Sequence, residues 1–308
     1  MRLPLIDADE LARLLPMRAA IDALERAFGD VLPEAPQRSH LEVPGGELLL
    51  MPAAGQAGVG VKLVTLNPEN PEQGLPFVQA AYLLFAPGTL SPEAVIEGGA
   101  LTALRTAAVS GLATRYLARP DARRLVLFGA GVTANAHLDA MLAVRPFRVV
   151  RVVSRSPGPA EALAARARGA GLDAGVAGPD AVIEADVVCT CTTSSQPVFD
   201  GTLLAAGAHV NAIGAYRPDM RELDDETVRR ARVVVETREA AMAEAGDLLI
   251  PIETGVIDPE HVVADLSELV RGAPVRRGPE DVTLFKSVGL AAEDLAVARA
   301  ALDARTAS

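Results

Sequence analysis

The sequence predicts an α/β protein in which a parallel sheet flanked by helices follows an α+β region. Its most informative stretch is an apolar run, Leu125–Phe128, that leads directly into Gly129-Ala130-Gly131-Val132-Thr133-Ala134 and then into an Ala-rich amphipathic segment. This is the order of strand, tight turn and helix that a dinucleotide site requires. Further apolar runs then alternate with helical segments, as in a parallel sheet with helices on both faces. The fold predicted for this part is therefore a Rossmann-type dinucleotide-binding domain.

The glycine turn has a suitable residue at each position that the motif constrains. Gly129 permits the tight turn, and Gly131 lets the backbone approach a pyrophosphate, whose charge then lies at a helix N-terminus. Ala134 occupies the position of a frequent third glycine, where only close packing of the helix on the strand is needed. Val132 and Thr133, which open the helix, belong to the same predicted cofactor site.

Helices and strands of a different pattern are expected before this motif. Asp7 resembles the first residue of a capping box before Leu11–Leu15, and a second amphipathic helix is predicted over Met17–Phe28. Short apolar runs separated by Gly, Pro and Asn predict strands of an antiparallel or mixed sheet at 48–51, 59–64 and 80–85. A helix is predicted from about 102 to 118, because Pro120 lies just beyond its end.

The elements after this helix alternate along the chain. Strands are predicted at 125–128, 149–153, 174–177, 186–191, 208–213 and 232–236, and helices at 132–144, 160–170, 224–230, 259–271 and about 290–304. The best domain boundary is the end of the 102–118 helix, and the last helix is expected to return to the first domain. We therefore predict one domain over 1–118 with 288–308 and a nucleotide-binding domain over 119–287.

Composition narrows the classes of function. The formal net charge of −11 disfavours nucleic acid and acidic membrane surfaces as partners. No apolar run approaches the roughly 18 residues of a membrane span, and the N-terminus lacks a basic region followed by an apolar stretch, so a cytoplasmic location is expected. Cys189 and Cys191 are best explained as small buried hydrophobes. No cluster of residues has metal-ligand spacing, so no metal is expected.

The end of the second strand of the nucleotide-binding domain bears on the cofactor type. A carboxylate there would bind the ribose 2′-hydroxyl of NAD, but the strand ends in Ser154-Arg155-Ser156. An arginine flanked by serines suits a 2′-phosphate, although an ordinary solvated arginine would fit the same pattern. We therefore favour NADP(H) and leave NAD(H) open. Thr190 and Thr192 follow the fourth strand at the edge where dinucleotides bind, and they are either cofactor contacts or turn hydroxyls.

Eight segments in the right order resemble the ornithine cyclodeaminase/mu-crystallin family over nearly the whole chain. Leu104–Ser110 and Phe285–Gly289 are the distinctive ones. The other segments are Leu50–Ala53, Lys62–Thr65, Gly129–Val132, Val210–Ala215, Arg221–Asp224 and Glu244–Asp247. The resemblance implies a homodimer whose first domain binds substrate and forms the dimer, with active sites in the cleft between the domains. It also implies hydride exchange between a nicotinamide ring and the α-carbon of an amino or imino acid.

The resemblance further implies which residues bind substrate. Arg38 matches an arginine that binds the substrate carboxylate, Lys62 a lysine that reaches the same substrate, and Arg105 an arginine near substrate and cofactor. A guanidinium can clamp a carboxylate, and Lys62 can donate a proton to an imine if neighbouring cations lower its pKa. The alternative for each is a surface cation, and it is weakest for Lys62, which interrupts an apolar strand. Further residues expected at the site are His40, Thr106 and Ser287, the last two near the cofactor.

Two departures from the cyclodeaminases decide the predicted reaction. Those enzymes hold the distal amine of ornithine with an aspartate and a glutamate, and the matching positions here are Tyr216 and Leu49. Asp219 lies nearby but is not an aligned replacement; it and Tyr216 are candidate substrate contacts. Because an unpaired buried ammonium is costly, a substrate without that amine is favoured. We predict reduction of a cyclic imino acid, such as Δ1-pyrroline-2-carboxylate to L-proline, by NAD(P)H.

Two other functions stay open on the sequence alone. A true cyclodeaminase would convert ornithine to proline and ammonia with a tightly bound NAD. A protein of the crystallin type would bind nucleotide with little catalysis, and the retained Arg38, Lys62 and Arg105 argue mildly against this.

Overall fold

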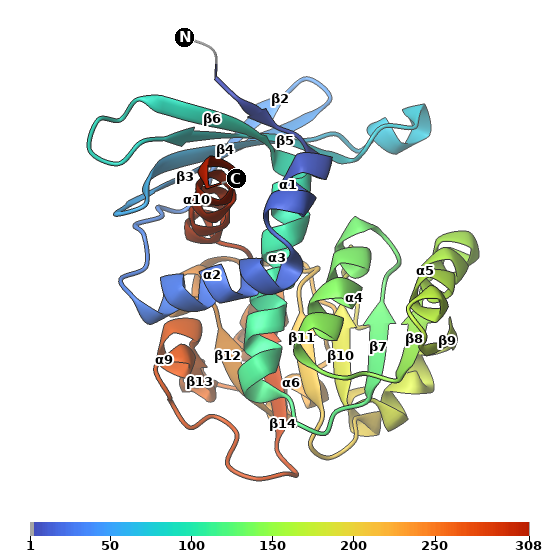
Figure 1. Cartoon of the computed structure of the whole chain (residues 1–308). Helices are drawn as coiled ribbons and strands as arrows, with labels where there is room; N and C mark the ends of the chain where they lie inside the picture. The colour runs from blue at the N-terminus through green and yellow to red at the C-terminus, as the bar shows by residue number, and fades with distance from the viewer. Residues whose placement is uncertain (1–2, 308) are drawn as a thin grey trace. The chain divides into compact units, whose positions relative to one another are not determined.

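The computed structural model describes residues 3–307, which form two compact units (Figure 1). The first, here called the mixed-sheet unit, comprises the described residues up to Arg105 together with those from Leu290 onward. The second, the parallel-sheet unit, is Thr106–Gly289. The first boundary lies inside helix α3 (Gly98–Leu117), whereas the sequence-based boundary was placed after it. Within residues 3–307, no helix combines the length and the apolar character needed to cross a membrane.

The mixed-sheet unit is built on one sheet, which among the described residues has the strand order β1-β6-β5-β4-β3-β2. The edge strand β1 runs parallel to β6, and the other neighbours are antiparallel. Its strands are β1 (Leu5–Ile6), β2 (Ser39–Val43), β3 (Gly46–Gly55), β4 (Gly58–Leu66), β5 (Val78–Phe85) and β6 (Pro92–Glu97). The predicted mixed sheet is therefore present, and β1, β2 and β6 are additions to it.

One face of this sheet is covered by helices (Figure 1). Helix α10 (Ala291–Thr306) packs on β3, β4 and β5, and α1 (Ala8–Leu14) and α2 (Met17–Gly29) pack against α10. The side chain of Asp7 caps α1 by accepting a hydrogen bond from Glu10 N at 2.8 Å, as its sequence predicts. Burial alternates along β4, so Lys62 and Val64 lie on the buried face while Leu63 lies on the other.

The parallel-sheet unit has the strand order β13-β12-β14-β11-β10-β7-β8-β9 within the described part of the chain, and all its neighbouring strands are parallel. Its strands are β7 (Arg124–Phe128), β8 (Val149–Val153), β9 (Asp173–Val176), β10 (Val187–Thr190), β11 (His209–Ala212), β12 (Ala231–Val235), β13 (Val262–Asp265) and β14 (Val282–Lys286). The chain order reverses between β7 and β10. In such sheets the dinucleotide binds outside the carboxyl ends of the strands at this point.

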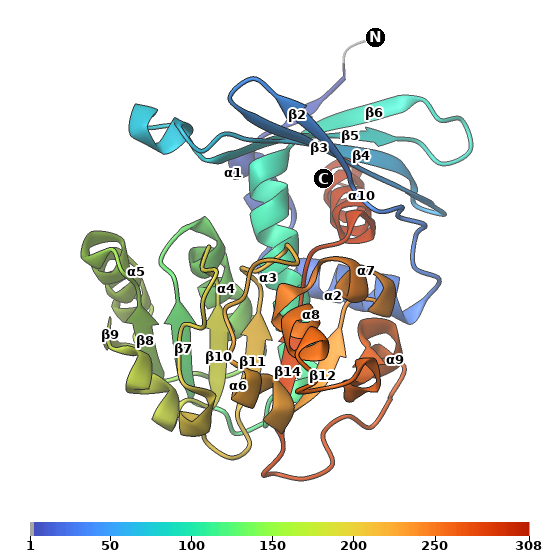
Figure 2. The same cartoon turned by 180° about the vertical axis from the view of Figure 1, so that it is seen from behind.

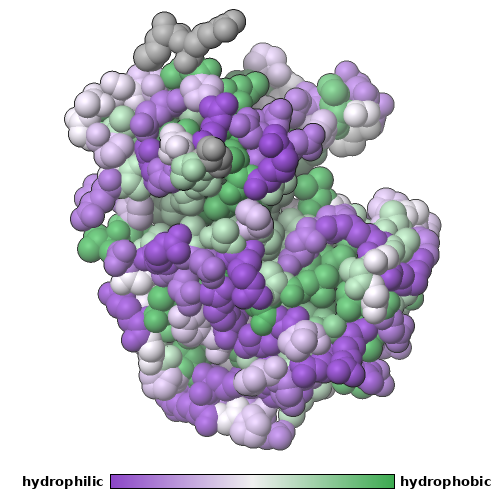
Figure 3. All heavy atoms as spheres, viewed as in Figure 1, coloured by the Kyte–Doolittle hydropathy of each residue, from purple (hydrophilic) through white to green (hydrophobic). Residues whose placement is uncertain are grey.

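Helices cover both faces of the parallel sheet. Figure 1 shows α4 (Val132–Val144) and α5 (Pro157–Gly169) on one face, and Figure 2 shows α6 (Asp225–Arg230) and α8 (Gly246–Glu253) on the other. The short remaining helices are α7 (Arg238–Glu244), α9 (Leu266–Val270) and the 3-10 turns η1 (Asn70–Gln73), η2 (Pro179–Glu184), η3 (Gly201–Leu203) and η4 (Pro259–His261). Viewed as in Figure 1, the surface is largely hydrophilic with scattered hydrophobic patches (Figure 3).

The prediction for residues 259–271 is wrong. This segment was predicted as one helix, but it holds η4, the strand β13 and the short helix α9. The reason is that Asp265 forms a capping box with Glu268, which starts a helix there and leaves Val262–Asp265 to pair with β12. The helix 132–144 and the six strands predicted from 125 to 236 are confirmed with small shifts at their ends.

Candidate functional site

In the mixed-sheet unit, two of the predicted cations meet at one buried carboxylate. Lys62 Nζ lies 2.7 Å from Asp294 Oδ2 and donates a hydrogen bond to Asp294 Oδ1 at 2.9 Å. Arg105 Nε donates to the same Oδ1 at 3.1 Å, and its Nη1 donates to Glu293 Oε2 at 3.1 Å. All four side chains are nearly or fully buried. A buried charge needs a partner, and the first turn of α10 supplies both acids.

The environment of Lys62 gives it a pKa suited to proton transfer. Burial, then the charge of Arg105 and, least, that of Arg38 lower the pKa of its ammonium to about 8, although Asp294 opposes this shift. The charge of the third predicted cation, Arg38, thus also acts on Lys62, although more weakly than that of Arg105. At neutral pH, Lys62 is therefore protonated but can release its proton far more readily than an exposed lysine.

The segment before β3 carries two further predicted residues. Arg38 is half-buried just before β2, and His40 lies exposed on β2, where its Nδ1 contacts Glu47 Oε1 across the hairpin. His40 therefore has a local structural partner. Leu49, which the resemblance predicts to match the cyclodeaminase glutamate, is buried on β3.

In the parallel-sheet unit, the glycine turn has the backbone that the motif predicts. Gly129 follows β7 with a φ of +98°, and a Cβ on it would lie 2.5 Å from Cys191 O. Gly131 is the N-cap of α4, and a Cβ there would meet nothing within 4 Å. No side chain caps α4, and Val132 is 73% exposed. The first-turn N–H groups, including that of Thr133, therefore have no side-chain cap, as a pyrophosphate site at a helix N-terminus requires.

The loop after β8 contains the residues that bear on the cofactor type. Ser154 Oγ accepts a hydrogen bond from Ser156 N at 3.2 Å, and Arg155 between them is exposed. Neither a carboxylate nor another described side chain engages the guanidinium of Arg155. The loop therefore presents a cation where NAD-selective proteins of this fold place an acid.

The two threonines after β10 are held by an acid that the sequence analysis did not select. Glu222 accepts hydrogen bonds from Thr190 Oγ1, Thr192 Oγ1 and Thr192 N, each at 2.7 Å, and from Gly214 N at 2.6 Å. Burial and then Asp247 raise the pKa of Glu222, while Lys286 and the threonine hydroxyls oppose this shift. Thr190 is fully buried, and Thr192 is half-buried. Both threonine hydroxyls therefore already donate hydrogen bonds within the protein, as expected if they are turn hydroxyls.

The other predicted residues of this unit differ in burial and in hydrogen-bond partners. Ser287 Oγ donates to the buried Glu236 Oε1 at 2.6 Å, and Glu236 also accepts from the N–H groups of Val288 and Gly289. Thr106 lies buried on α3. Tyr216 is half-buried, whereas Asp219 is exposed and lies 3.4 Å from Arg217 Nε.

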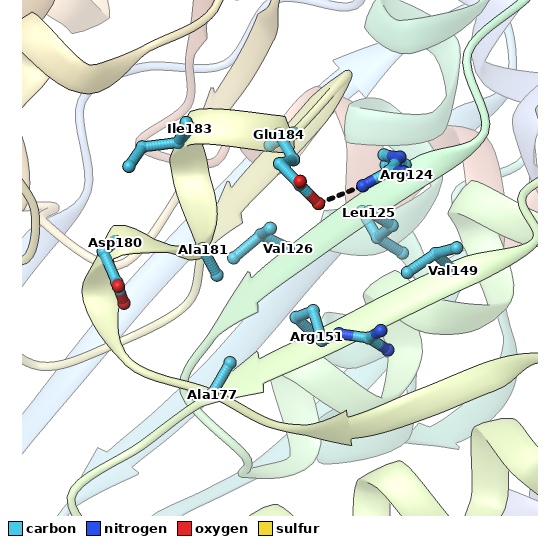
Figure 4. A pocket seen from close by; sticks show the side chains of 11 residues that line it. Arg124, Leu125, Val126, Val149, Arg151, Ala177, Asp180, Ala181, Ile183 and Glu184 are labelled. Carbon is cyan, nitrogen blue, oxygen red and sulfur yellow. Dashed lines mark hydrogen bonds and ion pairs between the residues drawn. The ribbon is translucent and has the colours of Figure 1, made fainter.

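A hollow of about 380 Å³ lies on the sheet face beneath η2 (Figure 4). Its lining includes Arg124 and Val149, which are the first residues of β7 and β8, and Arg124 pairs with Glu184 at its rim. The hollow lies over the first residues of β7 and β8 and extends to Ala177, just after β9. None of the predicted cofactor residues lines it, so it is not the predicted cofactor site.

Histidines and cysteines supply no metal centre in the part of the chain that the structure describes, where no group of three or more His, Cys, Asp or Glu could hold an ion. His137 contacts Thr133 O and Ser110 Oγ, and burial lowers its pKa to about 4. His209 contacts Thr283 Oγ1 and Asn211 Oδ1, and burial lowers its pKa to about 3. Both are neutral structural groups at physiological pH.

Sequence reasoning missed the acids that organise these residues: Glu222, Glu236, Glu293 and Asp294. Asp294 follows its partner Lys62 by 232 positions, so no local spacing could connect them. A usable signal did exist at α10, because two adjacent acids in the first turn of a helix attract nearby cations.

A family model and individual known proteins match this chain over most of its length. A model of the ornithine cyclodeaminase/mu-crystallin family matches residues 5–307. A Delta(1)-pyrroline-2-carboxylate reductase of Bacillus cereus is 35% identical over 306 residues, covering 96% of this chain and 94% of the relative. Ketimine reductase mu-crystallin of Rattus norvegicus is 39% identical over 277 residues, covering 89% and 83%.

Two solved structures are similar over almost their whole length. Thermococcus litoralis Delta(1)-pyrroline-2-carboxylate reductase, in complex with NADH and L-proline, has a TM-score of 0.94 and 37% identity and covers 99% of this chain and 98% of its own. An archaeal alanine dehydrogenase dimer with bound NAD has a TM-score of 0.94 and 32% identity, covering 100% and 97%.

Proposed function

The chain belongs to the ornithine cyclodeaminase/mu-crystallin family, and on this premise we propose that it reduces a cyclic imino acid to the corresponding L-amino acid with a nicotinamide cofactor. Δ1-pyrroline-2-carboxylate, which would give L-proline, is the favoured substrate. The observation that carries the proposal is the buried cluster of Lys62, Arg105, Asp294 and Glu293, near which Arg38 also acts.

The charges of this cluster suit a monoanionic substrate. Lys62, Arg105 and Arg38 contribute three positive charges, whereas Asp294 and Glu293 contribute two negative charges. One positive charge is left for the carboxylate of an imino acid, and a guanidinium binds a carboxylate with directional hydrogen bonds. Both acids are already engaged by cations, so neither is available to a distal ammonium. This supports an imino acid over ornithine.

The same cluster contains a proton donor. When bound, a reduced nicotinamide supplies the hydride that reaches the imine carbon. Lys62 donates its ammonium proton to the imine nitrogen, which thereby becomes the amine of the product. Asp294 holds Lys62 in place and favours its protonated form, so it prepares the lysine for the next proton transfer. Arg38 and Arg105 orient the substrate carboxylate.

We propose NADPH as the preferred cofactor, with NADH as the less favoured one. The support is Arg155, an exposed cation between two serines where an acid would bind a 2′-hydroxyl. Gly129, Gly131 and the first turn of α4 would hold the pyrophosphate. In this proposal the parallel-sheet unit binds the cofactor, and the mixed-sheet unit binds the substrate and forms the dimer.

The dimer proposal rests on the face of the mixed sheet that no helix among residues 3–307 covers. Helices pack on one face of the mixed sheet, while the other carries Leu5, Leu41 and Leu63 at 62%, 54% and 41% exposure. Strand register places Leu41 beside Leu48 and Leu63 beside Leu50 on this face. An apolar sheet face of this kind favours a partner, and a second copy of the chain would bury it. One similar structure is a dimer.

The test is a screen of NADPH and NADH oxidation with Δ1-pyrroline-2-carboxylate, Δ1-piperideine-2-carboxylate, and pyruvate with ammonia. L-ornithine without added cofactor is the fourth arm. We expect the cyclic imino acids to be reduced fastest and ornithine to release no ammonia. Ammonia release from ornithine with no imine reduction would overturn the proposal in favour of a cyclodeaminase, and binding of nucleotide without any turnover would favour a binding protein.

A further inference from the structure

Three segments singled out in the sequence converge on one buried cluster of the parallel-sheet unit. Asp247 Oδ2 lies 2.9 Å from Lys286 Nζ, and both side chains are fully buried. Asp247 Oδ1 accepts hydrogen bonds from Glu222 N at 2.7 Å and Leu223 N at 2.9 Å. The substrate and cofactor assignments above give this cluster no role.

The cluster holds both ends of one loop, residues 214–221, here called the Tyr216 loop. At its start, Lys286 Nζ donates a hydrogen bond to Ala215 O, and Glu222 accepts one from Gly214 N at 2.6 Å. At its end, Asp247 fixes the N–H groups of Glu222 and Leu223. The loop backbone also packs closely on α8, because a Cβ on Gly246 would lie 2.0 Å from Met220 O.

Stability alone does not account for two buried acids and a buried lysine. Replacing a buried ion pair by well-packed apolar residues is often neutral or stabilising. What the charged groups supply instead is direction, since they bond to particular backbone groups in the loop, Gly214 N and Ala215 O, and just after it, Glu222 N and Leu223 N. The residues between these fixed ends include Tyr216, which the resemblance predicts to match the amine-binding aspartate of the cyclodeaminases.

We infer that Glu222, Asp247 and Lys286 are positioning residues that hold the Tyr216 loop in the one conformation that selects the substrate ring. This inference rests on the proposed function for its kinetic consequence, but its structural consequence stands without it. Loosening the loop is expected to raise KM for the imino acid and to reduce discrimination between five- and six-membered rings. The affinity for NADPH is expected to stay unchanged.

The test is the double variant Lys286→Met/Asp247→Asn. Lys286→Met alone would leave a buried carboxylate unpaired and is prone to misfold, whereas the double variant removes both charges. The asparagine introduced in this variant keeps an oxygen for Glu222 N and Leu223 N, so only the link to Lys286 and Ala215 is lost. We expect amide hydrogen exchange at 214–221 to accelerate at least about tenfold in the free protein, and KM to rise about tenfold with kcat changed less.

A matched control exists at the other end of the sheet. Asp186 pairs with Arg119 Nη2 at 2.5 Å and accepts from the consecutive N–H groups of Arg123 and Arg124, which is the same bonding pattern. The variant Arg119→Met/Asp186→Asn should lower Tm while leaving exchange of the Tyr216 loop and KM as in the wild type.

The outcomes separate the two proposals. If loop exchange and the ring preference of the Lys286→Met/Asp247→Asn variant match the wild type, the positioning inference is wrong. If the control variant raises KM equally, destabilisation explains the effect and the inference is also overturned. If the wild type reduces no cyclic imino acid while loop exchange accelerates as expected, the proposed function fails and the loop scaffold stands.

Discussion

Lys62 is the residue whose surroundings determine the chemistry that the proposal assigns to it. A lysine in an apolar strand would be unfavourable without a partner, and Asp294 provides one at 2.7 Å. Its pKa, lowered to about 8 by burial and by Arg105 and Arg38, makes the lysine both charged at neutral pH and ready to lose its proton. In the proposed mechanism, proton donation and carboxylate binding therefore come from a single cluster.

The first prediction concerns the pH dependence of imine reduction. The donor must be protonated, and Lys62 loses its proton as pH rises through its pKa of about 8. We therefore expect kcat/KM for the imino acid to be level below pH 8 and to fall above it, approaching about tenfold per pH unit. Initial rates from pH 6 to 10 at saturating NADPH measure this. A rate that rises across that range would exclude Lys62 as the donor.

Asp294→Asn is the control for that assignment. Asp294 raises the pKa of Lys62, so removing its charge lowers the pKa below about 8. The fall in kcat/KM should then begin at a lower pH than in the wild type. A thermal melt of the variant checks that it is folded, because breaking a buried pair costs about 3 kcal/mol or more.

Arg155 carries the second prediction, which concerns the choice of cofactor. A charge-assisted hydrogen bond to a phosphate contributes about 1.5–3 kcal/mol, so Arg155→Ala should weaken NADPH binding about tenfold or more. NADH lacks the 2′-phosphate, and its affinity should hardly change. Fluorescence titration with both cofactors measures the ratio. Equal losses for the two would mean that Arg155 does not contact the 2′-phosphate.

Among the elements, the turn from β7 to α4 offers a matched pair of glycine substitutions. Gly129 has a positive φ, and a Cβ there would lie 2.5 Å from Cys191 O, whereas Gly131 has φ −82° and open space around it. Gly129→Ala should therefore lower Tm markedly. Gly131→Ala should leave Tm within about 2 °C but weaken cofactor binding about tenfold, because its methyl group enters the space of the pyrophosphate.

Thermal melts without cofactor and titrations with NADPH separate the two effects of this pair. Unchanged NADPH affinity in Gly131→Ala would place the pyrophosphate elsewhere. Equal Tm values for the two variants would contradict the backbone argument.

Helix α10 is the last element of the chain, but it packs against helices and strands from the first part of the chain. It brings Glu293 and Asp294 to Lys62 and Arg105 and packs along β3–β5. From the sequence, the last helix is expected to return to the first domain, but no residue of it is predicted to belong to the site. Its two acids are what convert isolated cations into a cluster with defined charge.

For the whole molecule, the fourth prediction concerns assembly. Leu63 is 41% exposed on the uncovered face of the mixed sheet, and Val263 is 39% exposed on β13 of the other unit. Leu63→Glu should place a charge in the proposed dimer interface and shift the protein towards the monomer. Val263→Glu, with nearly the same exposure, should leave the mass unchanged. Light scattering after gel filtration measures both. A wild-type monomer would contradict the dimer proposal.

The elements were predictable where the pattern that defines them is local. The glycine turn, helix α4 and the strands β7, β8 and β10 depend on spacing within a few residues, and they lie where the sequence analysis placed them. The 259–271 segment was wrong because a cap at Asp265 outweighed the helical pattern. Strand β14, which pairs between β11 and β12, was not predicted, although Val282–Phe285 is rich in strand-forming residues.

Local patterns of residue type were enough to predict the fold class and the glycine turn, and the family resemblance predicted the three candidate cations. Which acid meets which base depends instead on the folded chain. Lys62 and Asp294 are 232 positions apart, and Thr190 and Glu222 are 32 apart, so only folding brings them within hydrogen-bonding distance. Because burial and those partners determine the charge and pKa of a side chain, the chemistry of the site is a property of the folded chain.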